Sequence, residues 1–198
     1  MLTLILDTST DYTLLALAND DCLLAEYPLP VGRASIHLMP SIRGFLKCHS
    51  LNINELKSIA VGIGPGAFTG TRIGVTIAKT LGYALDIPLL PFCSLRAFKP
   101  LTKGPFTSLI DAKGGLVYAI NGSNGESTTY ESPQLHKLEE LKAQTLLSPD
   151  APDLQARLNK PQLKWHTVTP SAEHLATQLS SLTPTPPKAV EVLYLRTP

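Results

Sequence analysis

The sequence predicts an α/β fold, a mixed five-strand sheet with helices, followed by a truncated second domain. Three observations predict it. Short apolar runs and two helical periodicities alternate through the first hundred residues. Tight polar turns separate the first three runs, whereas helical segments separate the later ones. A hydrophobic content of 43% over 198 residues suffices for one large domain or two small ones.

The first three predicted strands form an antiparallel meander. Their apolar runs lie at residues 2–6, 12–18 and 22–27, and Pro28 stops the third run. The turns between them are short and rich in Ser, Thr, Asn and Asp. Turns this short join antiparallel neighbours, which predicts a meander.

A first helix is predicted at residues 34–48. Leu38, Ile42 and Phe45 recur at helical spacing and share one face. Pro40 lies inside this pattern, where a proline kinks a helix or marks its first turn.

A glycine-rich loop at residues 62–74 leads from a strand at 58–61 into a helix that ends near Leu85. Thr69 is its candidate N-cap. The loop lacks the lysine of the P-loop motif, and Thr69 stands where the dinucleotide motif needs its third glycine. A tight turn that seats a helix on the sheet is favoured over direct phosphate binding.

A strand at residues 88–92 and a short helix capped by Ser94 complete the order β-β-β-α-β-α-β-α. This order matches one half of the actin-like ATPase (ribonuclease H-like) fold. A weak internal repeat agrees with it, because Asp7 and Asp111 each end an apolar strand that opens a hairpin. We therefore expect a first domain at 1–104 and a reduced second domain at 105–198.

The second half carries weaker patterns and too few predicted strands for a full second actin-like domain. A mobile polar loop is expected at residues 123–132. Helices are expected at 134–147, 153–158 and 171–182, and a strand is expected at 163–168. A Pro-rich segment, 183–188, predicts a stiff extended spacer. The apolar run at 189–195 predicts that the end of the chain folds back onto the protein.

Composition limits the function classes. The net charge is +1 with scattered Lys and Arg, so a partner would have to supply much of the grip on any RNA. Three distant cysteines fit reduced thiols in a cytosolic protein. Neither a signal peptide nor a membrane-spanning run is recognisable, so we expect a cytoplasmic protein.

A vestigial nucleotide site is the main candidate for chemistry. It would consist of Asp7, Thr8, Ser9, Gly64, Gly66, Thr69 and Asp111. Thr8 and Ser9 stand where active actin-like ATPases usually have a glycine, and their side chains crowd a nucleotide. Turn-forming aspartates are the favoured interpretation. An active ATPase or small-molecule kinase that uses Asp7 and Asp111 is the alternative.

Catalytic and metal motifs are missing from the sequence. No two of the five histidines are spaced as in HxxxH or HExxH, so no metal ligand is predicted. Phe68 occupies the position of the serine in G-x-S-x-G, so no hydrolase nucleophile is predicted there. An M22-type glycoprotease would need a metal that these residues do not provide. We therefore predict no catalytic residue.

Gly74, Ala78 and Gly82 recur every four residues in the helix after the loop. Such a ridge of small residues lets another helix approach closely. The neighbour could be this chain's own sheet and first helix, or another chain. Arg72, in the first turn, is unfavourable for the helix dipole and could pair with a carboxylate across an interface.

Residues 60–74 resemble the signature of the TsaB (YeaZ) family. Residues 5–10, 109–113 and 193–196 resemble further family motifs, whereas 123–190 carry little signal. The resemblance implies a non-catalytic scaffold subunit that pairs with TsaD and is joined by the ATPase TsaE. Together they transfer a threonylcarbamoyl group to the adenosine next to the anticodon of tRNA.

The resemblance also implies the partners and the docking face. No cofactor of its own is expected, since the partners bind ATP and magnesium, including at the shared interface, and tRNA is contacted only through the complex. The helices at 34–48 and 69–85 would dock TsaD or a second copy in a homodimer. The residues expected on this face are Leu38, Ile42, Phe45, Arg72, Ile73, Gly74, Ile77, Ala78, Leu81 and Gly82.

Overall fold

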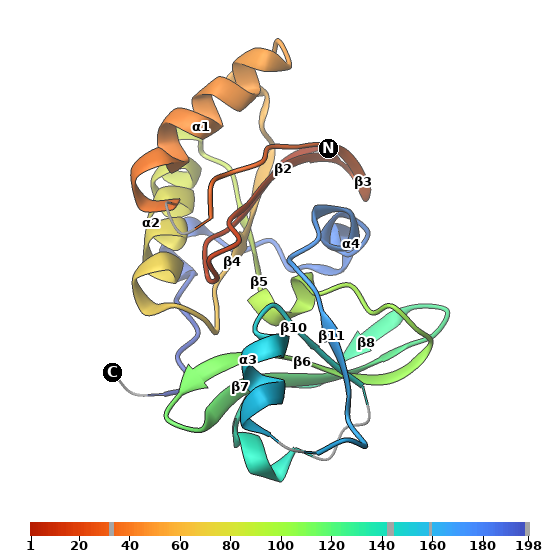
Figure 1. The fold of residues 1–198 in the computed structure, drawn as a ribbon. Coiled ribbons are helices and arrows are strands. Elements are labelled where there is room, and N and C mark those ends of the chain that lie inside the picture. Colours follow the sequence, from red (N-terminus) through yellow and green to blue (C-terminus); the bar gives the residue numbers. More distant parts are fainter. Residues whose placement is uncertain (32–33, 142–144, 159, 197–198) are drawn as a thin grey trace. The chain divides into compact units, whose positions relative to one another are not determined.

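A computed structural model describes residues 1–31, 34–141, 145–158 and 160–196 (Figure 1). The chain forms two compact units: unit 1 is Met1–Ser94 with Ser171–Leu193, and unit 2 is Leu95–Pro170 with the residues from Tyr194 onward. This division corrects the consecutive domains expected from the sequence. Residues 171–193 return to unit 1, where Val190 packs in the core and Thr185 pairs with Leu89.

Unit 1 is built on a five-stranded mixed sheet in the order β3-β2-β1-β4-β5. The strands are β1 (Leu2–Asp7), β2 (Leu14–Asn19), β3 (Cys22–Glu26), β4 (Ser58–Gly62) and β5 (Leu89–Phe92). The first three are antiparallel, β4 is parallel to β1, and β5 is parallel to β4. The predicted meander and crossovers are confirmed.

The helices of unit 1 are α1 (Ala34–Cys48), α2 (Phe68–Leu85) and α4 (Ala172–Ala176), with 3-10 turns at Ile53–Glu55, Leu179–Ser181 and Pro187–Ala189. A further 3-10 turn, Ser94–Ala97, lies at the boundary of the units. α1 continues through Pro40. α1 and α2 lie together on one side of the sheet, and α4 packs near β2 and β3 (Figure 1).

The predicted N-cap of α2 was wrong. The cap is Ala67, which makes no side-chain cap hydrogen bond, and Thr69 lies inside the helix. The amide of Ala67 donates to the carbonyl of Ser9, 2.7 Å away, while its own carbonyl accepts from the amide of Thr71. A long-range backbone contact therefore fixes the start of the helix, where the sequence suggested a threonine hydroxyl.

Unit 2 is built on a six-stranded sheet in the order β11-β10-β6-β7-β8, with β9 also paired to β7. Its elements are β6 (Gly104–Lys113), β7 (Leu116–Asn124), β8 (Thr128–Tyr130), β9 (Gln134–Lys137), a 3-10 turn (Leu138–Glu140), β10 (Thr145–Ser148), α3 (Ala151–Arg157) and β11 (Lys164–Thr167). The prediction of too few strands was wrong.

Two errors account for the missed strands. The expected loop at 123–132 contains β8, and the expected helix at 134–147 contains β9 and most of β10. Residues 142–144 of that expected helix lie outside the described residues. β8 and β9 each pair antiparallel with the long β7, and such tertiary pairing overrides weak local preferences. Among the described helices, none is long and apolar enough to cross a membrane.

Candidate functional site

The end of β1 and the first two residues after it are buried. Asp7, Thr8 and Ser9 are each 2–3% exposed. The carboxylate oxygen Oδ1 of Asp7 accepts a hydrogen bond from the amide of Ser9, 2.8 Å away. The other oxygen, Oδ2, has no hydrogen-bond partner among the described residues. Burial raises the pKa of Asp7, and hydrogen bonds, chiefly from Ser9, offset this only in part.

The glycine-rich loop packs directly on this turn. The hydroxyl of Thr8 donates to the carbonyl of Gly70 at 2.7 Å. A side-chain carbon added at Gly66 would overlap Ser9, and one added at Gly70 or Gly74 would overlap Thr8. These glycines are therefore required for the contact between two segments of the protein itself.

Further along the loop, the amide and carbonyl of Gly64 are both engaged. The amide donates to the hydroxyl of Ser94 at 3.1 Å, and the carbonyl accepts from the amide of Ser94 at 2.9 Å. Gly64 has a φ of +99°, in the region that favours glycine. Together with Ala67, whose amide binds Ser9, Gly64 therefore presents no spare donor to an anion.

The residues expected on the docking face divide into two groups. Those buried in unit 1 are Leu38, Ile42, Phe45, Gly74, Ala78, Leu81 and Gly82. Arg72 is exposed, and Ile73 and Ile77 are half-buried. The buried group includes the small-residue ridge, whose glycines meet Thr8, Leu89 and Pro187 of this chain. The sequence left this chain and another chain open as the neighbour of the ridge, and the structure shows contacts with this chain.

The outward face of α2 carries Arg72, which was expected on the docking face, and aromatic residues that were not expected there. The guanidinium carbon of Arg72 lies 3.6 Å from the centroid of the Phe68 ring. Phe68 is 43% exposed, Tyr83 on the same helix 61%, and Met39 of α1 44%. The helical spacing could have indicated their exposure, because these residues lie off the helical faces that carry the predicted apolar rows.

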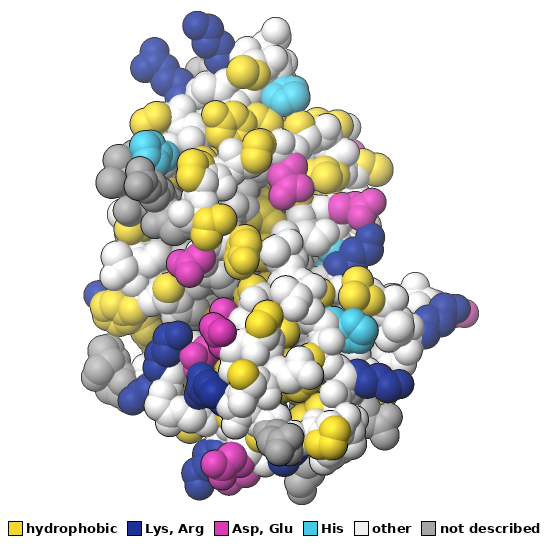
Figure 2. All heavy atoms as spheres, viewed as in Figure 1, with side chains coloured by type: hydrophobic (Ala, Val, Ile, Leu, Met, Phe, Trp, Pro, Cys, Tyr) yellow, Lys and Arg dark blue, Asp and Glu magenta, His cyan; other side chains and the backbone are white. Residues whose placement is uncertain are grey.

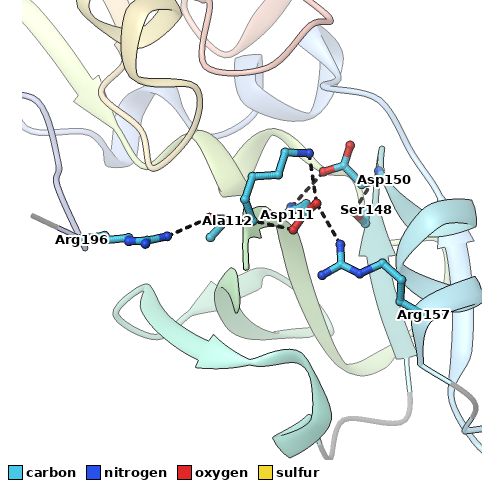
Figure 3. Close-up of polar contacts among 7 residues, drawn as sticks. Asp111, Ala112, Ser148, Asp150, Arg157 and Arg196 are labelled. Carbon is cyan, nitrogen blue, oxygen red and sulfur yellow. Dashed lines mark hydrogen bonds and ion pairs between the residues drawn. The ribbon is translucent and has the colours of Figure 1, made fainter. Parts of the chain in front are cut away.

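Asp111 lies near the end of β6 in unit 2, and its side chain is only 8% exposed. Its Oδ1 accepts from the amide of Lys113 at 2.9 Å, and its Oδ2 accepts from the Lys113 ammonium at 3.1 Å and from Arg157 at 3.0 Å. Its own amide donates to Asp150 at 2.9 Å, and the amide of Asp150 donates to Ser148 (Figure 3).

These contacts decide the charge of Asp111. Burial alone would raise its pKa, but the hydrogen bonds from Lys113 and the charges of Lys113 and Arg157 outweigh it, so the pKa is lowered. Asp111 is thus an ionised anchor with both oxygens occupied. No group of three His, Cys, Asp or Glu side chains that could hold a metal ion occurs among the described residues. Asp7 and Asp111 belong to different units.

Comparison with known proteins identifies the family. Residues 33–172 match the family model described as TsaD: tRNA N6-adenosine threonylcarbamoyltransferase. The chain is 38% identical over 123 residues to the tRNA threonylcarbamoyladenosine biosynthesis protein TsaB of Bacillus subtilis (strain 168). It is 29% identical over 120 residues to the protein of the same name from Escherichia coli (strain K12). The chain belongs to the family that this model describes, and within it to the TsaB (YeaZ) branch.

The alignments with these two TsaB proteins cover 60% and 58% of this chain, and 53% and 52% of the relatives. The chain thus spans about half the length of the curated relatives it matches. Two solved structures from Pseudomonas aeruginosa share its fold: YeaZ, and an uncharacterized protein with similarity to peptidase YEAZ. Their TM-scores are 0.80 and 0.83 at 21% and 22% identity, over 98% of this chain and 99% of theirs.

Proposed function

We propose that this chain is a cytoplasmic, non-catalytic subunit in the formation of threonylcarbamoyladenosine on tRNA. It pairs with a TsaD-like transferase, a TsaE-like ATPase joins the pair, and the threonylcarbamoyl group passes to the adenosine next to the anticodon. The observation that carries the proposal is the packing of Thr8 and Ser9 against the glycine-rich loop. The chain keeps the fold of the family, while atoms of the protein itself occupy the space beside the turn that would face a nucleotide.

The proposal assigns no cofactor to this chain. In actin-like folds the loops after the Asp-ended strands hold the phosphates, and here one such loop is packed and the other is ion-paired through Asp111. ATP and magnesium are therefore bound by the partner subunits, including at the interface that they share with this chain. The tRNA substrate is bound by the assembled complex.

The docking face of the proposal is the outward side of α2, with Met39 of α1. It presents Phe68 with Arg72 stacked on its ring, and Tyr83, about four helical turns after Phe68, with more than half of its surface exposed. Aromatic residues and arginine are the types that most often dominate binding energy at protein interfaces. The same face is available to a second copy of the chain, so homodimer and heterodimer would compete for it.

A double substitution, Phe68→Ala with Tyr83→Ala, tests the face. Both side chains are exposed, so we expect the melting temperature to stay within a few degrees while co-elution with the TsaD-like protein of the same organism is lost. Leu24→Ala is the matched control, because Leu24 is an equally exposed apolar residue on β3. Co-elution of the double variant at the wild-type ratio would refute this face. Substitution of the fully buried Ala78 would instead test folding.

The activity is tested by reconstitution. The purified chain, the TsaD-like protein and the TsaE-like protein are combined with tRNA, threonine, bicarbonate and ATP, together with the enzyme that supplies the threonylcarbamoyl group. We expect modified adenosine only when all subunits are present. Equal product formation without this chain would refute the proposed role.

A further inference from the structure

The charge of the chain is distributed unevenly. Unit 2 contains ten Lys and Arg residues against seven Asp and Glu, whereas unit 1 contains seven against nine. Unit 2 is therefore basic, although the net charge of the whole chain is close to zero. Figure 2 shows dark blue Lys and Arg side chains at several places over the elements of unit 2. Any contact with a polyanion should accordingly be sought in unit 2.

Three cations are anchored on consecutive residues at the end of β6. Arg157, from the end of α3, binds the carboxylate of Asp111 at 3.0 Å. Arg196, from the end of the chain, donates to the carbonyl of Ala112 at 3.4 Å. Lys113 itself supplies the third positive group. Figure 3 shows the two arginines reaching the strand from separate parts of the sequence. We call Lys113, Arg157 and Arg196 the cation row.

The burial of these groups leaves the positive charge outermost. Asp111 is 8% exposed, whereas Arg157 is 39% and Lys113 85% exposed. The second carboxylate nearby, Asp150, is half-buried and accepts the amide of Asp111. Arg196 binds a neutral carbonyl, so this hydrogen bond does not offset its charge. The three cations thus outnumber the two carboxylates, Asp111 and Asp150, and Asp111 is largely buried.

We propose that the cation row binds phosphate groups of the RNA backbone. That this RNA is the tRNA substrate rests on the proposed function. Guanidinium groups match phosphate oxygens in bidentate geometry, and lysine adds a mobile point charge. Lys113 and Arg157 share the Oδ2 of Asp111, and Arg196 binds the next residue, so the row offers adjacent cations to neighbouring phosphates. Contacts of this kind add affinity and orientation without reading sequence.

The effect is measured on the reconstituted complex, with tRNA as the varied substrate. Arg196→Gln is the principal variant, because Arg196 does not touch Asp111 and its loss leaves that ion pair intact. We expect the KM for tRNA to rise about three- to tenfold at low salt with kcat unchanged, and the slope of log KM against log salt to fall by about one. Lys57→Gln, at an exposed lysine of unit 1, removes the same charge and should change neither.

Lys113→Gln and Arg157→Gln are the supporting variants and should raise the KM in the same way. The proposal is overturned if all three variants match Lys57→Gln in KM and in salt slope. Should the complex prove inactive, the proposed function fails separately. Direct binding of labelled tRNA to the combined subunits, measured by fluorescence anisotropy with the same variants, then still decides whether the row contacts RNA.

Discussion

Asp111 binds Lys113 twice, through the backbone amide at 2.9 Å and through the side-chain ammonium at 3.1 Å. Lys113 has a φ of +64°, which is unfavourable for a residue with a side chain. It lies where the register of β6 and β7 shifts, just before the Gly114–Gly115 turn. The carboxylate of Asp111 therefore stabilises the strained backbone at Lys113 and also forms an ion pair with its side chain.

Asp111→Asn should destabilise unit 2. The amide oxygen can still accept from the backbone of Lys113, but the charge that holds Lys113 and Arg157 is lost. We expect a loss of about 1–2 kcal/mol in the free energy of unfolding, near the lower range for a charged hydrogen bond because the cations are exposed. Urea unfolding measures it. Glu126→Gln, at an exposed carboxylate of unit 2, should have no effect.

The same pair predicts a pH dependence. Because the folded pKa of Asp111 lies below its ordinary value of 3.8, the unfolded chain binds this proton first as the pH falls. The stabilisation is complete above pH 3.8 and is lost below it as the pH approaches the folded pKa. The difference in stability between wild type and Asp111→Asn should shrink over this window. A difference that stays constant would contradict the ion-pair account.

Asp7 predicts the opposite sign. Its folded pKa is raised above 3.8, so over the interval between the two values the folded chain binds more protons than the unfolded chain. Stability should fall as the pH rises through that interval. Asp7→Asn removes the buried charge and should be at least as stable as wild type at pH 7, with a weaker dependence above pH 4. Asp11→Asn, at an exposed carboxylate, serves as the control.

Substitutions at two glycines separate close packing from helix propensity. Gly70→Ala places a carbon against the carbonyl of Thr8 and should cost about 1–3 kcal/mol, since backbone atoms cannot rotate away. Gly44→Ala, inside α1 with nothing within 4 Å of the new carbon, should stabilise the protein by roughly 0.5–1 kcal/mol. Thermal unfolding of both variants is the measurement. Equal effects would show that the loop contact is not required.

The sequence predicted unit 1 well because its signals are local. Apolar runs and short turns define β1 to β3, and helical spacing defines α1 and α2. Partners distant in sequence were not predictable in the same way. The glycine ridge of α2 was recognised as a site of close approach, but nothing in its spacing shows that Gly74 meets Thr8. β8 and β9 were missed because their polar residues become strands only by pairing with β7.

The candidate site was also predictable only as far as its signals are local in the sequence. The two aspartates and the glycine-rich loop were found from motifs, whereas the state of each depended on distant contacts. The pKa of Asp111 is lowered mainly by Lys113, two residues away, and further by the charge of Arg157, 46 residues further along the chain. Leu38 and Phe45 have the apolar character of an interface, but the structure buries them. Spacing alone does not distinguish an apolar face that meets the sheet of its own chain from one that meets another protein.

The filled turn after β1 predicts the outcome of a nucleotide titration. A triphosphate at the glycine-rich loop would have to displace the hydrogen bonds of Thr8 to Gly70 and of Ala67 to Ser9, both 2.7 Å long. We therefore expect isothermal titration calorimetry of the isolated chain with magnesium–ATP to give no binding tighter than about 1 mM. Micromolar binding that disappears in Asp111→Asn would instead establish an active nucleotide site. Addition of the TsaD-like partner should create or strengthen ATP binding, because the proposed nucleotide sites belong to the partner subunits and the shared interface.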